Sequence, residues 1–267
     1  MPLLHLVILA LIQGITEFLP ISSSGHLALY PLLSGAPDQG LALDVAVHVG
    51  TLAAVMLYFR GDVAAAVRGG LGLLRGNVNS QEARLALHLV IATIPAVVAG
   101  GALSLFDLTG ALRSLQVIAW ATILGGVLLW LGDRFGREKK QAGEWRLSDA
   151  LAMGVAQTFA LIPGMSRSGV TITAARALGY IRVDAARLSM LMSIPVIVAA
   201  GMLIGIEIAE AGDSALTGDS LIAMLLSFFA ALAAIAVFMR MLERWSMTVF
   251  VVYRILLGVA LLLIANW

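Results

Sequence analysis

Long apolar runs, separated by short polar segments, dominate the chain. A helix needs about 20 predominantly apolar residues to cross the hydrocarbon core of a bilayer. Six runs come close to that length and predict full transmembrane helices at residues 41–59, 88–105, 115–131, 188–206, 220–239 and 247–265. The pattern therefore predicts an all-α polytopic membrane protein, folded as a single integral membrane domain over residues 1–267.

Two further apolar segments, residues 2–33 and 149–178, are interrupted midway. LPISSSG breaks the first and IPGMSRSG breaks the second, with half-length apolar runs on either side. Pro and Gly disfavour a continuous helix, and Ser competes for its backbone hydrogen bonds. Each segment is either a re-entrant hairpin or one Pro-kinked span, and we favour the hairpin.

The distribution of Lys and Arg predicts the orientation, because cytoplasmic loops carry an excess of both. The segments 60–87 and 132–148 hold nine of the 17 basic residues, so we assign them to the cytoplasm as loops. The segment 207–219 holds four acidic residues and no basic one, so we place it outside. In the resulting alternation, the first broken segment enters from the outer face and the second from the cytoplasm.

The two breaks resemble each other. A shift of 144 residues aligns the first and third serines and the glycine of SSSG, residues 22–25, with the two serines and the glycine of SRSG, residues 166–169. Together with the charge-derived topology, this match predicts two inverted-topology repeats, about 1–131 and 149–267. Inverted repeats with discontinuous helices are the architecture of many transporters.

Composition supports the membrane interpretation and excludes several classes of site. The chain is 60% hydrophobic and 12% charged, whereas a soluble protein carries roughly 25% charged residues. A net charge of +1 gives no basic footprint for nucleic acid. The absence of cysteine excludes disulfides and thiolate metal sites. The apolar amino terminus lacks the basic n-region of a signal peptide, so we expect it to belong to the mature fold.

A few ionisable residues remain inside the apolar segments, where a charge is expensive to bury. They are Glu17, Asp44, Arg167 and Arg254, with the imidazoles of His26 and His48. Such groups either form structural ion pairs, for example Glu17 with Arg167, or line a wet cavity, which we favour. Arg254 is either a second phosphate ligand or a residue that snorkels or pairs with Asp44. We expect His48 to be a packed, hydrogen-bonded residue.

The stretch PGMSRSGVT, residues 163–171, has the chemistry of an anion site. The planar guanidinium of Arg167 suits a phosphate or a carboxylate. A helix that starts after the break would aim its amides and its positive dipole end at the same point. PISSSGH repeats the arrangement with His26 in place of a charge. Phosphate or pyrophosphate is the natural occupant, although the serines could simply cap the half-helices.

Glu17 would repel an anion, so it makes sense as a titrating group or a metal ligand. Gln13 lies four residues earlier, on the same helix face. Oxygen ligands suit Mg²⁺ or Ca²⁺, which could bridge to phosphate oxygens. Alternatively, Glu17 is a general base or orients His26. A serine or His26 can be the nucleophile, so these groups together indicate phosphoryl transfer.

At these motifs the sequence resembles the undecaprenyl pyrophosphate phosphatase family, the bacitracin-resistance membrane phosphatases. That family carries a Glu/Gln-x-x-x-Glu motif, which is QGITE here, and then Ser-Ser-x-Gly-His, which lies within FLPISSSGH. Its second motif, Pro-Gly-x-Ser-Arg-Ser-Gly-x-Thr, is matched in full by PGMSRSGVT. The length and the hydrophobic layout also match, so the resemblance covers essentially the whole chain.

The resemblance implies an enzyme that hydrolyses undecaprenyl pyrophosphate, a lipid carrier, to undecaprenyl phosphate and inorganic phosphate. This reaction would recycle the carrier for cell-wall synthesis and confer resistance to bacitracin. A divalent cation, Mg²⁺ or Ca²⁺, is the implied cofactor. The resemblance also implies a multi-pass protein of the bacterial plasma (inner) membrane, with a site that opens toward the periplasm or exterior, two re-entrant segments and assembly as a homodimer.

The site residues follow from the motif positions and from the polar groups around them. We expect catalytic roles for Glu17, His26, Ser23 and Arg167. We expect phosphate contacts from Ser22, Ser24, Ser166, Arg167, Ser168, Gly169, Thr171 and Arg254. The metal ligands would be Glu17 and Gln13, although the neutral amide of Gln13 supplies no charge.

The main alternative is a transporter or flippase of undecaprenyl phosphate or another anionic lipid. Broken helices in inverted repeats suit alternating access as well as catalysis, and Glu17 could couple transport to protons. A phosphatase releases inorganic phosphate in detergent, whereas a flippase needs a sealed bilayer. A structural scaffold is a distant third function, because it does not need clustered Ser, Arg, His and Glu residues.

Overall fold

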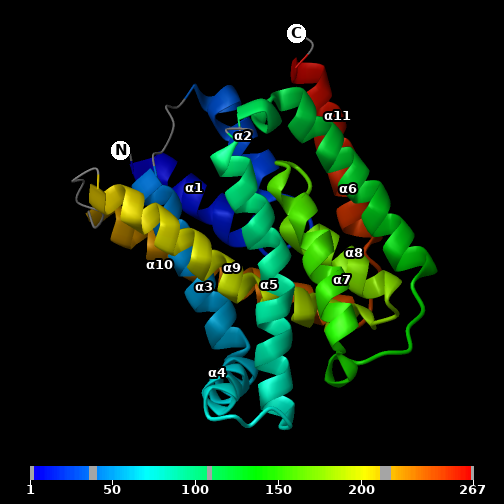
Figure 1. Ribbon diagram of the computed structural model, residues 1–267. Helices are drawn as coiled ribbons and strands as arrows, with labels where there is room; N and C mark the ends of the chain where they lie inside the picture. Colours follow the sequence, from blue (N-terminus) through cyan, green and yellow to red (C-terminus); the bar gives the residue numbers. More distant parts are fainter. Residues whose placement is uncertain (1–2, 36–40, 107–109, 211–217, 266–267) are drawn as a thin grey trace.

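The computed structural model describes residues 3–35, 41–106, 110–210 and 218–265 (Figure 1). Over these residues the chain is an assembly of α-helices joined by short loops. The helices are α1 (Leu3–Thr16), α2 (Ser23–Ser34), α3 (Leu41–Tyr58), α4 (Arg60–Leu74), α5 (Gln81–Leu105), α6 (Leu115–Phe135), α7 (Leu147–Thr158), α8 (Arg167–Ala177), α9 (Arg182–Glu210), α10 (Gly218–Leu242) and α11 (Thr248–Ala265). Short 3-10 helices η1 (Gly110–Arg113), η2 (Ala142–Glu144) and η3 (Phe159–Leu161) lie between them.

Each of the six predicted spans falls on a long helix. Within the described residues, α5, α6, α9, α10 and α11 are long and apolar enough to cross a membrane, and α3 reaches that length only together with α4. Two helices start earlier than their apolar runs: α5 begins at Gln81 and α9 at Arg182. The extra turn of α5 is possible because the Ser80 hydroxyl caps it, accepting from the amide of Ala83 at 3.0 Å.

The predicted loop 60–87 is wrong in its first half, which forms helix α4. This helix leaves α3 at an angle of 92° and packs against α5. Four glycines weaken its helical signal in the sequence. One of them has a packing reason, because Gly69 lies directly on the backbone of Glu82 and a side chain at Gly69 would overlap it.

The two broken segments are broken in the structure as well. Helices α1 and α7 have 14 and 12 residues. At 1.5 Å per residue they extend about 21 and 18 Å, short of the roughly 30 Å hydrocarbon core. Each is followed by an irregular stretch and a second short helix, α2 or α8. The interruption therefore agrees with the prediction of re-entrant segments.

Helices from each half of the chain pack on helices from the other half. Helix α1 packs on α10 from the second half of the chain, and α7 packs on α5 from the first half. Helices α6 and α11 pack on each other (Figure 1). This exchange agrees with two related halves, whereas the repeat boundaries 1–131 and 149–267 stay a prediction.

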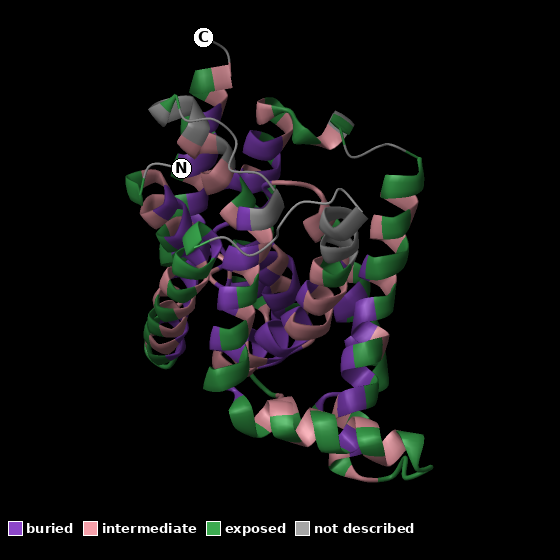
Figure 2. Ribbon diagram, turned by 90° about the vertical axis from the view of Figure 1, so that its left-hand side faces the viewer, coloured by how far each residue is buried: buried purple, intermediate pink, exposed green. Residues whose placement is uncertain are grey.

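The outer faces of the long helices are apolar. Buried residues concentrate in the middle of the assembly, and exposed ones cover its outside (Figure 2). Large apolar side chains are exposed on several helices, among them Val98, Trp120, Phe229 and Leu256. An apolar surface of this extent fits contact with lipid and not with water.

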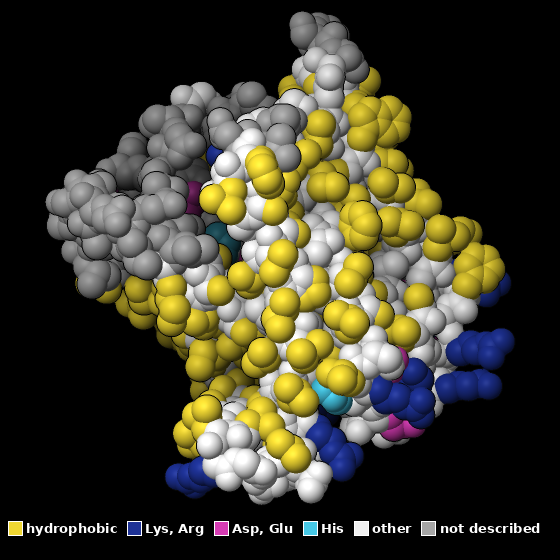
Figure 3. Space-filling view, in the orientation of Figure 1, with side chains coloured by type: hydrophobic (Ala, Val, Ile, Leu, Met, Phe, Trp, Pro, Cys, Tyr) yellow, Lys and Arg dark blue, Asp and Glu magenta, His cyan; other side chains and the backbone are white. Residues whose placement is uncertain are grey.

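Basic residues gather at one end of the molecule, at the bottom of Figure 3. We call it the basic end, and define it by α4, the α6–α7 loop and the first turn of α9. The predicted loop 132–148 starts late, because α6 continues to Phe135. The carboxylate of Asp133 joins Arg182 at 2.7 Å and the buried Arg176 at 3.3 Å. The predicted acidic loop 207–219 lies largely outside the described residues.

Tyr180 and Asp149 fasten the α8–α9 turn to α7 at the basic end. The Tyr180 hydroxyl donates to Asp149 Oδ2 at 2.6 Å, and Lys140 Nζ donates to the same oxygen at 3.1 Å. Burial and the adjacent carboxylate raise the pKa of the Tyr180 hydroxyl above its ordinary value. Tyr180 therefore stays a protonated donor throughout the physiological range.

Candidate active site

The two breaks have the same local geometry. Ser22 and Ser166 both adopt positive φ, at 72° and 67°, and they are the non-glycine residues with positive φ in the described part of the chain. Each hydroxyl accepts from the amide three residues later, Gly25 at 3.3 Å and Gly169 at 3.2 Å. Strained backbone of this kind clusters at functional sites. The alignment by 144 residues is thus repeated in three dimensions.

The serine two residues after the strained one in each motif connects its break to the opposite one. Ser24 Oγ accepts from the amide of Gly164 at 3.0 Å, and Ser168 Oγ donates to the carbonyl of Leu19 at 2.9 Å. A shift of 144 residues relates Ser24 to Ser168, so the two cross-links correspond. They hold the two breaks side by side.

Arg254 of α11 also joins the two breaks, through hydrogen bonds to their backbone carbonyls. The side chain is fully buried, and all three guanidinium nitrogens donate to backbone carbonyls. The acceptors are Pro20 from the first break, Gly164 and Met165 from the second, and Ala121 and Thr122 from α6. Arg254 therefore clamps the two breaks and α6 together, and its contact with phosphate stays a prediction.

Several other predicted phosphate ligands are likewise used inside the protein. Ser22, Ser166 and Ser168 are buried and serve the caps and cross-links. The amide of Gly169 is taken by its cap, and the missing side chain makes room for Arg254. Buried Thr171 bonds to Ser189 Oγ at 2.6 Å. These residues shape the two breaks through internal hydrogen bonds, and their contacts with phosphate stay a prediction.

Replacing Arg254 by methionine is expected to destabilise the protein strongly. The change would leave buried carbonyls without donors, and each unsatisfied buried group costs about 1–3 kcal/mol. We expect a loss of at least about 3 kcal/mol, measured as unfolding in detergent. Arg244→Met, at an exposed position after α10, is the matched control. Unchanged stability of Arg254→Met would contradict the clamp.

Glu17 is the centre of the polar cluster between the breaks. Its side chain is 9% exposed and follows the end of α1. Glu17 Oε1 accepts from Arg167 Nη2 at 3.0 Å. Glu17 Oε2 accepts from Gln13 Nε2 at 2.8 Å and from Ser23 Oγ at 3.2 Å. The ion pair, Gln13 and Ser23 therefore form one cluster.

Arg167 keeps one donor free in this cluster. Its side chain is 13% exposed, and Nη1 is buried without a hydrogen-bond partner. Arg167 is also the first residue of α8, where the first backbone N–H groups of the helix have no intrahelical acceptor. A buried, unsatisfied guanidinium nitrogen beside a helix N-terminus is suited to an anionic oxygen.

His48 belongs to the cluster, which the sequence interpretation missed. His48 Nδ1 donates to the carbonyl of Asp44 at 2.7 Å, so Nε2 is the acceptor for Gln13 Nε2 at 3.1 Å. His48 Nε2 lies 3.9 Å from Glu17 Oε2, and the side chain is 39% exposed. Only an isolated histidine in an apolar helix marked this residue in the sequence.

His26 is held at both ring nitrogens. Nδ1 donates to the carbonyl of Ser22 at 2.7 Å, so Nε2 accepts from the hydroxyl of Tyr253 at 2.5 Å. The hydrogen bonds described for His26 do not reach Glu17 or Arg167. Tyr253 is a contact that the sequence did not reveal, since α11 is distant in the chain.

Tyr253→Phe is expected to slow turnover about tenfold, the effect of losing one hydrogen bond to a working group. The remaining ring should leave folding intact. The decisive readout is the pH profile of kcat, which should shift because Nε2 loses its partner. Tyr58→Phe on the exposed side of α3 is the control. An unchanged profile would remove Tyr253 from the site.

The residues of the cluster fit a metal ion only in part. No group of three or more His, Cys, Asp and Glu side chains able to hold a metal occurs among the described residues. Gln13 Oε1 is, however, buried and without a partner beside the carboxylate of Glu17. One carboxylate and one amide oxygen suit Mg²⁺ when substrate phosphates and water supply the remaining ligands.

Comparison with known proteins agrees with this geometry. The model of the bacitracin resistance protein BacA family matches residues 6–260, which include both breaks and all the residues of the cluster. The chain belongs to the BacA family.

Curated relatives match the chain over nearly its whole length. An undecaprenyl-diphosphatase of Ruegeria pomeroyi is 54% identical over 265 residues, with 99% of both chains covered. A protein of the same name from Dinoroseobacter shibae is 55% identical, also with 99% of both chains covered. Undecaprenyl-diphosphatase 1 of Rhodospirillum rubrum is 49% identical, with 99% of this chain and 96% of the relative covered.

Proposed function

We propose that this protein is an undecaprenyl-diphosphatase. It hydrolyses undecaprenyl pyrophosphate to undecaprenyl phosphate and inorganic phosphate, which recycles the lipid carrier and supports bacitracin resistance. The observation that carries the proposal is the contact between Glu17 and Arg167, from the two family motifs, in a membrane protein about 50–55% identical to named diphosphatases. A flippase is not favoured by any of these relatives.

Arg167 binds the diphosphate in this proposal. Its free Nη1 and the first amides of α8 offer donors to the phosphate oxygens. Because Nη2 is held by Glu17, the guanidinium plane is fixed before substrate arrives. A preorganised cation of this kind stabilises the charge that develops on the transferring phosphoryl group.

Ser23 is the nucleophile that the geometry favours. Its hydroxyl donates to Glu17 Oε2 at 3.2 Å, so the carboxylate can accept the proton as the Oγ–P bond forms. The bond between the terminal phosphorus and the bridging oxygen breaks, and undecaprenyl phosphate leaves. Water then attacks the phosphoserine, inorganic phosphate leaves and the proton returns to Ser23. His26 is less suited to attack, since Tyr253 occupies its Nε2.

Glu17 and Gln13 Oε1 would hold a divalent cation, Mg²⁺ or Ca²⁺, together with the diphosphate. Such a cation neutralises charge on the phosphate oxygens. The support is the orphaned amide oxygen of Gln13 next to the carboxylate. In this proposal Gln13 binds the cation through Oε1, while its Nε2 donates to both Glu17 and His48.

EDTA is expected to lower phosphate release at least about 100-fold, since a bound cation supplies several kcal/mol of transition-state stabilisation. Purified protein in detergent would be assayed with farnesyl pyrophosphate, and excess Mg²⁺ or Ca²⁺ should restore release. Release that is unaffected by EDTA would remove the metal from the proposal without affecting the diphosphatase assignment.

The proposed setting is the bacterial inner membrane, with the basic end in the cytoplasm. The gathering of Lys and Arg at that end supports this orientation. The first break then enters from the outer side, so the site opens toward the periplasm. A homodimer is the proposed assembly, and cross-linking of the protein in native membranes would test it.

A further inference from the structure

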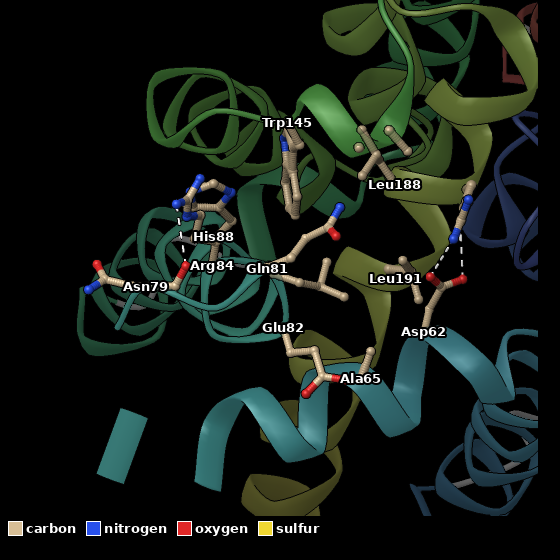
Figure 4. A pocket seen from close by; sticks show the side chains of 14 residues that line it. Asp62, Ala65, Asn79, Gln81, Glu82, Arg84, His88, Trp145, Leu188 and Leu191 are labelled. Carbon is tan, nitrogen blue, oxygen red and sulfur yellow. Dashed lines mark hydrogen bonds and ion pairs between the residues drawn. The ribbon is translucent and has the colours of Figure 1, made fainter. Parts of the chain in front are cut away.

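A cavity of about 770 Å³ opens at the basic end, away from the Glu17 cluster. Its lining comes from α4, α5, η2 and the first turns of α9 (Figure 4). No residue of either break lines it. The proposed hydrolysis therefore does not use this cavity.

The cavity has an apolar wall on one side and polar side chains on the other. Leu188 and Leu191 of α9 and the ring of Trp145 form an apolar wall (Figure 4). Trp145 is 7% exposed and packs edge-on against His88, with ring centroids 5.5 Å apart. Gln81 extends its amide toward the middle of the cavity from the start of α5. The cavity is thus amphipathic, like the head and first carbons of a lipid.

The acidic groups of the lining are neutralised by partners around the cavity. Asp62 pairs with Arg187 through two hydrogen bonds, and Glu82 pairs with Arg68 at 2.9 Å. Among the described residues, the remaining cation of the lining is Arg84.

The other side-chain hydrogen-bond donors that the structure describes in the lining either make one long hydrogen bond or have no partner. Arg84 Nη2 donates to the carbonyl of Asn79 at 3.3 Å. The side chains of Gln81 and His88 have no hydrogen-bond partner within the described part of the protein. The free polar capacity is therefore positive and rich in donors, which suits a phosphate group.

Helix α4 places the cavity at the membrane surface. It turns by 92° away from the spanning direction of α3. Val67, Leu71 and Leu74 lie on one exposed stripe of α4, and Leu74 is 87% exposed. Arg68 and Arg75 flank the stripe. A helix of this kind lies in the interface with its apolar face in the acyl boundary, so the cavity beside it is at the depth of lipid head groups.

We propose that this cavity binds the phosphate head group of a membrane phospholipid from the leaflet at the basic end. Arg84 and Gln81 contact the phosphate, and Leu188, Leu191 and Trp145 contact the glycerol and the first acyl carbons. Basic pockets between helices at a membrane surface recognise anionic lipids in this way. Such a lipid would fasten α4 to α5 and α9.

The test is binding of dioctanoyl phosphatidylglycerol to the detergent-purified protein, measured by native mass spectrometry. Glycerol 1-phosphate and dioctanoylglycerol serve as the arms without tails and without phosphate. Arg84→Gln should weaken lipid binding about tenfold, and Ala65→Phe, which fills the cavity, should abolish it. Arg75→Gln, at the exposed C-terminal end of α4 and outside the lining, should bind as the native protein does.

Equal binding by either partial ligand would overturn the proposal, since both head group and tail are required. Unchanged binding by Arg84→Gln and Ala65→Phe, or an equal loss in Arg75→Gln, would overturn it as well. Phosphate release from farnesyl pyrophosphate is followed in parallel and should be retained in all three variants. The outcome is therefore independent of the diphosphatase assignment.

Discussion

Arg167→Ala is expected to abolish phosphate release while the protein stays folded. The change removes the free Nη1, which is the proposed ligand of the diphosphate, and the Nη2 bond to Glu17. Removing a preorganised cation from phosphoryl transfer costs about 10³-fold or more in kcat. The measurement is release from farnesyl pyrophosphate in detergent, with the unfolding temperature recorded beside it.

Arg167→Lys and Arg113→Ala are the matched variants for this result. Lysine keeps the charge but loses the planar fork, so partial activity is expected. Arg113 is exposed in η1 and away from the breaks, and its removal should be neutral. Turnover near normal in a folded Arg167→Ala protein would show that the arginine only pairs with Glu17.

Glu17→Gln should lower kcat about 100-fold or more, because general-base catalysis contributes roughly 10²–10⁴-fold. Glutamine keeps the size of the side chain and an oxygen for Gln13, but it cannot take the proton of Ser23. Arg167 loses its counter-charge, so KM should stay equal or fall. This combination separates a base from a residue that only positions the substrate.

Glu243→Gln is the control for this second prediction, since Glu243 is exposed after α10. A Glu17→Gln protein with normal kcat and a raised KM would mean that Glu17 contributes to binding alone. Ser23→Ala adds a further comparison, because it removes the proposed nucleophile and leaves the ion pair between Glu17 and Arg167 in place.

The spans and the breaks could be predicted because they depend on local composition. A run of about 20 apolar residues predicts a spanning helix. The stretches PISSSG and PGMSRSG each interrupt such a run in this chain. Helix α4 escaped prediction because four glycines lower its helical propensity. Its contact with α5 through Gly69 outweighs that preference and is not visible in the sequence.

The residue types of the site could be predicted from the sequence, whereas the partners of the individual residues could not. Glu17 and Arg167 lie 150 residues apart and are in contact, as expected of two breaks that meet. Ser24, Ser168 and Arg254 were predicted to bind phosphate, and the structure shows them bonded to backbone groups that link the two breaks. His48 and Tyr253 come from other helices, so only the packing of those helices reveals their roles.

The most direct test of the account is a double-variant comparison of phosphate release from undecaprenyl pyrophosphate in detergent. It uses the native protein, Glu17→Gln, Arg167→Ala and the two changes combined. Groups that act as one unit give losses that do not multiply. We predict release by the native protein, severe loss in each single variant, and no further loss in the double variant. Losses that multiply would mean that the two breaks act separately, and no release by the folded native protein would contradict the diphosphatase assignment.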